Sequence, residues 1–196
     1  MKKKVLNVGG GSKSIAIPPH FDSFEHLLLD ISASGNPDVI CDARQLKSLG
    51  SNSFDAVYCS HNLEHYYKHD VPKVLGGFVH VLKEGGFAHI RVPDMQELMR
   101  QVIERQLDIN DELYRSAAGP ILVSDVIYGY GPEIESSGQD FYAHKTGFSL
   151  KSMTEQLERS GFSTIFGCTR NLEVEVIAFK GTPSPDHCAL LGLSPG

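Results

Sequence analysis

The feature that most constrains the fold is a glycine-rich turn between two short apolar segments near the start of the chain. Residues 4–8 read Lys-Val-Leu-Asn-Val and run directly into the triple glycine 9–11, and a later apolar segment, 27–30, ends in Asp30. Glycine has no Cβ, so it lets the backbone approach a ligand closely. A carboxylate at the tip of the next strand can accept hydrogen bonds from ribose hydroxyls. The pattern predicts a pocket for a nucleoside-containing cofactor at the carboxyl edge of a parallel sheet.

Short apolar segments bounded by turn residues predict strands along most of the chain. The predicted strands are residues 4–8, 27–30, 38–41, 54–59, 87–92, 162–169 and 172–180. The connections after the first three are too long for hairpins, as parallel strands require. The last two are separated only by Arg170-Asn171, which predicts an antiparallel hairpin. We therefore expect an α/β fold, a doubly wound, mostly parallel seven-stranded sheet with a C-terminal antiparallel hairpin.

Three segments with apolar residues every three or four positions predict helices. The first follows Asp70, a predicted N-cap, and the second opens at Asp94, which has capping-box spacing with Glu97. The third is capped by Ser149 and stopped by Gly161. The first crossover differs, because its paired prolines oppose a long helix and leave room for one short turn at most.

Residues 107–146 lack sustained periodicity and carry several glycines and aromatic residues. Long irregular segments inside a domain are often lids or binding loops, so we expect an inserted substrate or lid region built of turns and short helices. We expect residues 1–180 to form a single domain. Residues 181–196 are rich in proline and small residues, which predicts a disordered tail.

Composition excludes several classes of protein. The net charge of -6 gives no electrostatic reason to expect nucleic acid as a partner. No apolar run is long enough to span a membrane, and the apolar segment after the first lysines is too short for a signal peptide. The four cysteines form no CxxC pair, and three of them lie in apolar runs, which favours reduced thiols. We expect a cytoplasmic protein.

Two phosphate-binding patterns can be weighed against the glycine turn. A P-loop needs two glycines around Lys13, but Asn7 and Ser12 stand at those positions, so this pattern is rejected. The series Gly9-x-Gly11-x-x-Ser14 lacks the third glycine of a dinucleotide fold. Asp30 would nevertheless suit a dinucleotide ribose, so an NAD(P)-binding oxidoreductase remains an alternative.

The segment His61-Asn-Leu-Glu64-His65 matches the H-x-x-E-H pattern of inverted zinc peptidases. A catalytic zinc ion needs a third protein ligand, which the sequence does not single out. The motif also directly follows a buried strand end in a parallel sheet. We therefore expect no metal ion.

Several motifs taken in order resemble one enzyme family. They are the glycine turn, the acidic strand ends Asp30 and Asp42, the segment 53–65 with its closing Leu-Glu-His, and Leu-Lys-Glu-Gly-Gly-Phe at 82–87. Together they resemble the class I S-adenosylmethionine-dependent methyltransferases over residues 4–180. The similarity is closest to the branch with Leu-Asn-x-Gly-x-Gly as its first motif and Leu-Glu-His after the fourth strand. It implies a Rossmann-like methyltransferase fold, S-adenosylmethionine as cofactor and an enzyme of class EC 2.1.1.

The resemblance also implies which residues hold the cofactor. The glycine turn would pass close to the methionine portion, Asp30 would bind the ribose and Asp42 would lie beside the adenine. Most members carry an acidic residue where Asn7 stands, so this chain is expected to bind the cofactor's ammonium group more weakly. The implied cofactor-binding residues are Asn7, Gly9, Gly10, Gly11, Asp30, Ile31, Asp42, Ala43, Ser60 and His61.

An oxygen acceptor needs a proton removed at or near methyl transfer, and histidine is the natural base near neutral pH. The expected catalytic residues are His61 and His144, with Tyr130 as an orienting hydroxyl. His65 is an equally good candidate for a structural hydrogen bond. His144-Lys145 is the best candidate for substrate contact.

The expected activity is O- or N-methylation of a small molecule or saccharide. A catalytically inactive binding or scaffold protein is a further alternative, because Asn7 and the short first crossover depart from the family pattern. The sequence leaves the acceptor and the oligomeric state open.

Overall fold

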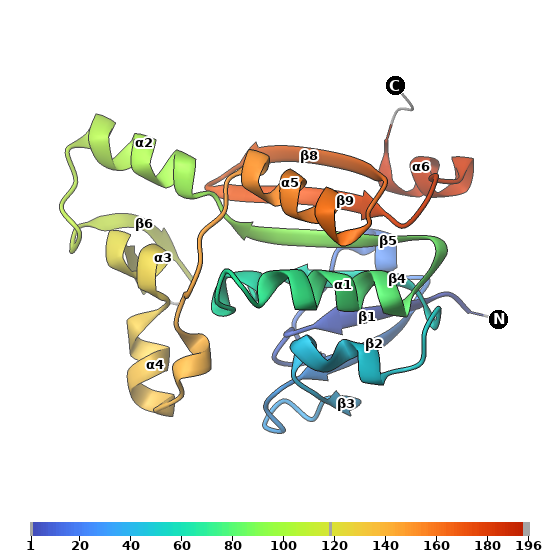
Figure 1. Cartoon of the computed structure of the whole chain (residues 1–196). Helices are drawn as coiled ribbons and strands as arrows, with labels where there is room; N and C mark the ends of the chain where they lie inside the picture. Colours follow the sequence, from blue (N-terminus) through green and yellow to red (C-terminus); the bar gives the residue numbers. More distant parts are fainter. Residues whose placement is uncertain (1, 118, 194–196) are drawn as a thin grey trace.

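A seven-stranded sheet organises the computed structural model, which describes residues 2–117 and 119–193 (Figure 1). Its strand order is β3-β2-β1-β4-β5-β9-β8. The strands are β1 (Lys4–Val8), β2 (Glu25–Asp30), β3 (Val39–Ile40), β4 (Phe54–Ser60), β5 (Leu82–Pro93), β8 (Thr164–Arg170) and β9 (Glu173–Phe179). The pairs among β1 to β5 are parallel, and β9 pairs antiparallel with both β5 and β8. The predicted fold class and its C-terminal hairpin are confirmed.

The strand bounds differ from the prediction mainly at β5, which begins at Leu82 instead of residue 87. Its register against β4 shifts between Phe54, which pairs with Leu82, and Ala56, which pairs with Phe87, so β5 carries an irregularity between Leu82 and Phe87. Gly85 has φ +71°, and a Cβ on Gly86 would lie 2.9 Å from the Asp55 carbonyl oxygen. The preceding helix ends at Val81, with Leu82 as its C-cap, so the two glycines lie inside β5 and let this strand bend close to β4.

One face of the sheet is covered by α1 (Val71–Val81), α5 (Leu150–Ser160) and the short 3-10 helix η2 (Ala43–Ser48), as Figure 1 shows. The apolar side chains of α1 that recur every three or four residues are fully buried, for example Val71, Val74 and Phe78. Ser149 caps α5 as predicted. Asp70 precedes α1, but its carboxylate makes no cap hydrogen bond and instead binds charged side chains.

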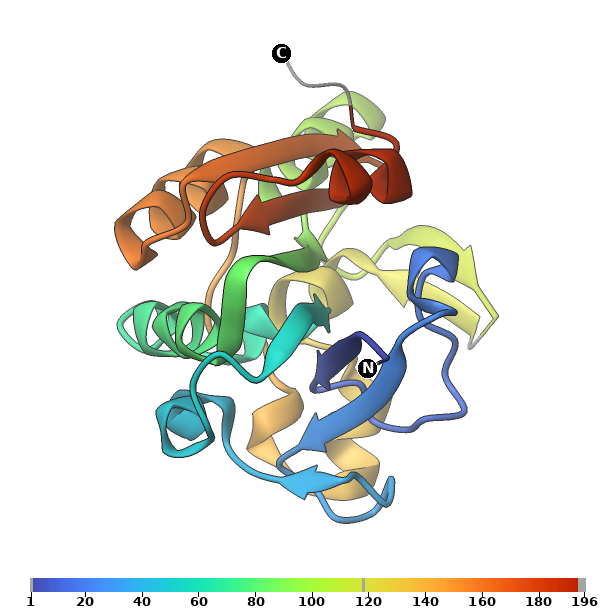
Figure 2. The same cartoon turned by 90° about the vertical axis from the view of Figure 1, so that its right-hand side faces the viewer.

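The other face is covered without a long helix. The first crossover contains only the 3-10 helix η1 (Pro19–Phe21), as its prolines predicted. Phe21 and Phe24 pack in an apolar layer that also takes in side chains near the end of the chain. In the segment expected to be a disordered tail, Pro185–Leu191 form helix α6 (Figure 2), and Leu191 of this helix packs against the same layer. Residues 194–196 of that expected tail lie outside the described residues.

The inserted region lies at the carboxyl ends of the parallel strands (Figure 1). It follows α2 (Met95–Arg105) and contains β6 (Glu112–Ser116), β7 (Gly119–Leu122), α3 (Val123–Tyr128), α4 (Gly131–Ser137) and the 3-10 helix η4 (Asp140–Tyr142). Turns and short helices were expected, but the antiparallel β6–β7 pair was not. Leu98 of α2 joins the region's own small core of Leu113, Val123 and Val126. None of the helices in the described part of the chain is long and apolar enough to cross a membrane.

Candidate functional site

The glycine turn after β1 lies tightly against two neighbouring segments. Gly9 and Gly11 have φ values of +70° and +67°, which favour glycine. A Cβ on Gly9 would lie 2.1 Å from the amide nitrogen of Asn62, in the segment after β4. The backbone N–H of Gly11 donates to Oδ2 of Asp30 at 3.0 Å. The turn is thus attached to the carboxyl end of β2 through Asp30.

Asp30 helps to line a cavity of about 240 Å³ at this edge of the sheet. Its other carboxylate oxygen accepts a hydrogen bond from the Ser32 backbone N–H at 2.9 Å, so both oxygens are oriented by the backbone. The lining residues are Gly9, Gly11, Asp30, Ile31, Ser32, Ser34, Asp42, Arg44, His61, Asn62, His65, Tyr66, Tyr67, Asp70, Phe141, Tyr142 and Lys145. They come from the ends of the parallel strands, from the segments that follow them and from the insertion.

Asp42 stands on the same cavity wall and forms an ion pair with Arg44. Its carboxylate accepts from the Arg44 backbone at 2.9 Å and from the Arg44 guanidinium at 2.5 Å. Arg44 also reaches Oδ2 of Asp70 at 3.3 Å. Burial alone would raise the pKa of Asp42, but the hydrogen bonds and charge of Arg44 hold it below its usual value. The second predicted carboxylate is therefore ionised and oriented by a cation that the sequence did not reveal.

The predicted cofactor residues divide into two groups in the structure. Gly9, Gly11, Asp30, Ile31, Asp42 and His61 line the 240 Å³ cavity, whereas Asn7, Gly10, Ala43 and Ser60 are not among its lining residues. Asn7 is buried, and a Cβ on Gly10 would lie 2.2 Å from its Nδ2 atom. Asn7 Nδ2 also lies 3.2 Å from Nε2 of His26. Asn7 thus packs against the glycine turn, and the expected contact with an ammonium group remains a prediction.

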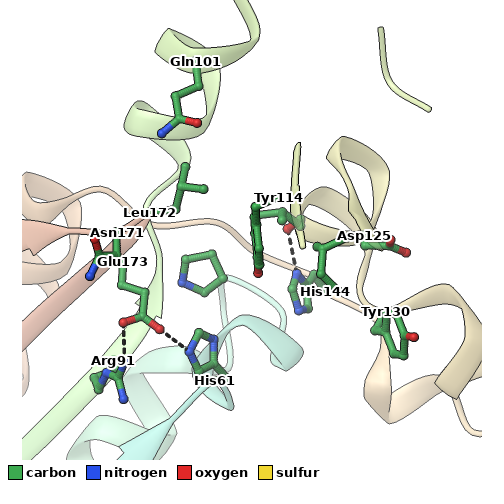
Figure 3. Close-up of a pocket in the computed structure, with 13 residues that line it drawn as sticks. His61, Arg91, Gln101, Tyr114, Asp125, Tyr130, His144, Asn171, Leu172 and Glu173 are labelled. Atoms are coloured by element: carbon green, nitrogen blue, oxygen red, sulfur yellow. Dashed lines mark hydrogen bonds and ion pairs between the residues drawn. The ribbon is translucent and has the colours of Figure 1, made fainter. Parts of the chain in front are cut away.

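A second cavity, of about 640 Å³, lies next to the first and shares His61 with it. Figure 3 shows its polar side chains, which converge from β5, β9 and the insertion. Its lining residues are His61, Arg91, Pro93, Gln101, Tyr114, Ile121, Asp125, Val126, Tyr130, His144, Asn171, Leu172 and Glu173. All three predicted catalytic residues therefore line one cavity.

His61 is held between two carboxylates. Its Nε2 lies 2.6 Å from Oε1 of Glu173, and its Nδ1 lies 3.5 Å from Oε1 of Glu64 (Figure 3 shows the first contact). Glu173 also pairs with Arg91. Burial by itself would lower the pKa of His61, but Glu173 and Glu64 outweigh it and raise this pKa to about 9. His61 is then protonated at neutral pH, which suits a cationic hydrogen-bond donor better than a general base.

His144 and His65 lie side by side, with their ring centroids 5.0 Å apart. Nδ1 of His144 is 2.9 Å from the Val126 carbonyl oxygen, and Nδ1 of His65 is 3.2 Å from that of Ala143. A carbonyl only accepts, so each Nδ1 carries the donated proton. In a neutral ring this leaves the lone pair on Nε2.

Backbone hydrogen bonds fasten the end of the insertion to the 3-10 helix η3 (Leu63–His65). The N–H groups of Lys145 and Thr146 donate to the Glu64 carbonyl oxygen at 2.7 and 3.1 Å. The His144 N–H donates to the Tyr128 carbonyl oxygen at 2.9 Å. The insertion is therefore fixed where the two cavities meet.

The sequence analysis missed several cavity residues. Arg91, Tyr114 and Glu173 line the larger cavity, and Arg44 lines the smaller one. A signal for Arg91 and Glu173 was present, because each is a charged residue near the end of a predicted strand. Those strands, β5 and β9, are neighbours, so the charges could have been matched across them.

Comparison with known proteins places this geometry in context. The sequence profile of a family described as a methyltransferase domain matches residues 20–90. The structure of a SAM-dependent methyltransferase from Archaeoglobus fulgidus is similar, with a TM-score of 0.57 and 16% identity over 90% of this chain and 86% of that one. A possible histamine N-methyltransferase from Thermotoga maritima gives 0.55 and 14%, over 92% and 83% of the two chains.

An O-methyltransferase family protein from Burkholderia thailandensis gives a TM-score of 0.54 and 12% identity over 93% of this chain. The present chain spans about half of that protein, since it covers 52% of its length. No protein of curated function matches the chain. Because the sequence identities are this low, what the solved structures establish is the fold, which is the Rossmann-like methyltransferase fold. Together with the matched domain they support S-adenosylmethionine as the cofactor.

Proposed function

We propose that the chain is an S-adenosylmethionine-dependent methyltransferase acting on oxygen or nitrogen of a small molecule or saccharide. The observation that carries the proposal is the junction of two cavities at His61. One cavity holds the glycine turn and both strand-end carboxylates, and the other is larger and lined by the insertion. Such a pair gives a donor and an acceptor separate places with a shared wall.

The residues of the smaller cavity fit an adenosyl group. Each carboxylate oxygen of Asp30 already accepts one backbone N–H and has lone pairs left for ribose hydroxyls. Asp42 stands ionised on the same wall, and the exposed side chain of Ile31 offers an apolar surface for a ring. When bound, S-adenosylmethionine supplies an electrophilic methyl group on a sulfonium sulfur.

The contribution of the chain's own residues is chiefly alignment, since an in-line displacement is accelerated by holding the reacting groups in position. His61, held between Glu173 and Glu64, places a fixed positive charge on the shared wall. Transfer of the methyl group to a hydroxyl releases one proton. A side chain with a free lone pair must therefore lie in the acceptor cavity to take that proton. Nε2 of His144 offers one, and Tyr130 offers a hydroxyl on the same cavity wall.

The insertion is proposed as the substrate-binding region of a single domain. Phe141, Tyr142 and Lys145 line the cofactor cavity, and Tyr114 and Tyr130 line the acceptor cavity. Aromatic rings and polar groups of this kind suit a sugar ring or a planar small molecule. Because the same region borders both cavities, binding of the acceptor there would also exclude water from the donor.

Isothermal titration calorimetry with S-adenosylmethionine and with NADH tests this proposal. We expect heat with the first only, and a loss of about tenfold or more in affinity for Asp30→Asn, which removes a charge that binds hydroxyls. Asp22→Asn, in the first crossover, is the matched control and should bind as the unmodified protein does. Heat with NADH alone would favour an oxidoreductase, and heat with neither ligand would favour a non-catalytic binding protein.

A further inference from the structure

Three side chains that could bind a metal ion converge where the insertion meets η3. One donor atom each of Glu64, His65 and His144 lie within 4.8 Å of one another. His65 lines the smaller cavity and His144 the larger one, where Figure 3 shows its ring. The three residues therefore stand between the two cavities.

Glu64 is the unusual member of this cluster. Its side chain is 2% exposed, and neither carboxylate oxygen has a hydrogen-bond partner among the described residues. Glu64 forms a long ion pair with His61, whose Nδ1 lies 3.5 Å from Oε1, while the other nitrogen of that ring lies closer to Glu173, at 2.6 Å. A buried carboxylate without hydrogen bonds is costly, and a bound cation is one of the few groups that compensates for it.

The two histidines are oriented as metal ligands commonly are. Both donate Nδ1–H to a backbone carbonyl, His65 to Ala143 and His144 to Val126. Such a second bond fixes the tautomer and leaves Nε2 free to coordinate. The backbone bonds from Lys145 and Thr146 to Glu64 hold the two chain segments together without help from an ion.

We propose that Glu64, His65 and His144 bind a divalent transition-metal ion, for which Zn²⁺ is the best match. Two imidazoles and one carboxylate suit zinc, and three protein ligands leave a coordination position open. Donor atoms of a tetrahedral zinc site lie about 3.4 Å apart, so binding would draw these side chains slightly closer. The proposal replaces the expectation of no metal, and it differs from the H-x-x-E-H pattern because Glu64 is a ligand and His61 is not.

An ion at this position would also act on the acceptor. A hydroxyl coordinated to a divalent ion loses its proton more readily, which would replace direct proton transfer to His144. This role rests on the proposed function, whereas binding of the metal does not. The two ideas can therefore fail separately.

The test is binding of Zn²⁺ to the full chain after dialysis against a chelator, followed by calorimetry, with Co²⁺ absorption spectra as a report on ligand geometry. We expect one Zn²⁺ per chain and a higher melting temperature with the metal. Glu64→Gln and His144→Gln should each weaken binding by about 100-fold or more. His69→Gln, whose side chain is 76% exposed outside the cluster, is the matched control and should bind normally.

Glu64→Gln also tests whether misfolding could explain a loss of Zn²⁺ binding. Without metal, this variant should melt close to the unmodified protein, because the substitution keeps the shape of the side chain and removes only the long ion pair with His61, at 3.5 Å. The proposal is overturned if the folded protein binds no Zn²⁺, or if the variants bind it as tightly as the control. It is also overturned if Zn²⁺ raises the melting temperature of Glu64→Gln as much as that of the unmodified protein, since Glu64 would then not be a ligand. Titration with S-adenosylmethionine in parallel shows whether the cofactor site is intact.

Discussion

Replacement of Gly35 by alanine should weaken cofactor binding, although Gly35 lies outside the glycine turn. An added Cβ would lie 1.6 Å from the Gly11 carbonyl oxygen and 2.8 Å from its carbon. Both are backbone atoms, so no side chain can rotate away to relieve the overlap. Restoring an ordinary contact of about 3.4 Å requires the two segments to separate by roughly 1.8 Å.

That separation should break the hydrogen bond from the Gly11 N–H to Asp30, which is 3.0 Å long. A hydrogen bond to a charged group contributes about 1.5–3 kcal/mol. The bond between Gly11 and Asp30 is exposed to solvent, so we take the lower value of this range. A loss of about 1.5 kcal/mol corresponds to roughly tenfold weaker binding of S-adenosylmethionine. Calorimetry measures this change directly.

Gly76→Ala is the matched control for Gly35→Ala. Its added Cβ would meet Lys47 at 3.7 Å, an ordinary contact, in the middle of α1. We expect unchanged affinity and a gain of up to about 1 kcal/mol in stability, since alanine favours helix over glycine. Equal affinity in Gly35→Ala and the unmodified protein would refute the reasoning about the turn.

Two further predictions concern stability. Gly77→Ala should destabilise the fold by about 1–3 kcal/mol, because the added Cβ would lie 2.7 Å from the Cβ of buried Leu46. Urea denaturation measures this change, and a stability equal to that of Gly76→Ala would contradict the prediction. Burial, assisted by His89, lowers the pKa of His20 to about 4. The folded state therefore binds fewer protons than the unfolded state, and stability present above about pH 6.5 should decline as the pH falls toward 4. His20→Gln should flatten that decline in pH-dependent denaturation, and an unchanged slope would argue against the assignment.

The parts of the fold that follow from local patterns could be predicted from the sequence. The strand ends at Asp30 and the helix caps at Asp94 and Ser149 are fixed by neighbouring residues, and the structure has them. The β6–β7 pair was missed because its apolar residue Leu113 is buried against Leu98, a contact that no local pattern reveals. Helix α6 was missed for the same reason, since it is short and packs against the sheet through His187 and Leu191.

The candidate site, like the fold, could be predicted from the sequence only in part. The sequence placed Asp30 and Asp42 at one edge of the sheet because the carboxyl ends of parallel strands meet there, and both line one cavity. It could not show that Arg44 engages Asp42, because that depends on the conformation of η2. Nor could it bring His144 beside Glu64, since long insertions have no fixed path.

The covering of the second sheet face ties the two ends of the chain together. Phe21 and Phe24, near the start, share an apolar layer with Leu191, near the end, and the His187 ring lies 5.6 Å from that of Phe87. A long helix in the connection between β1 and β2 would have covered this face with residues that directly precede β2. Here the cover comes from a segment that lies far along the chain from β2, so the segment that leads out of the glycine turn gains its full support only after α6 has packed against it.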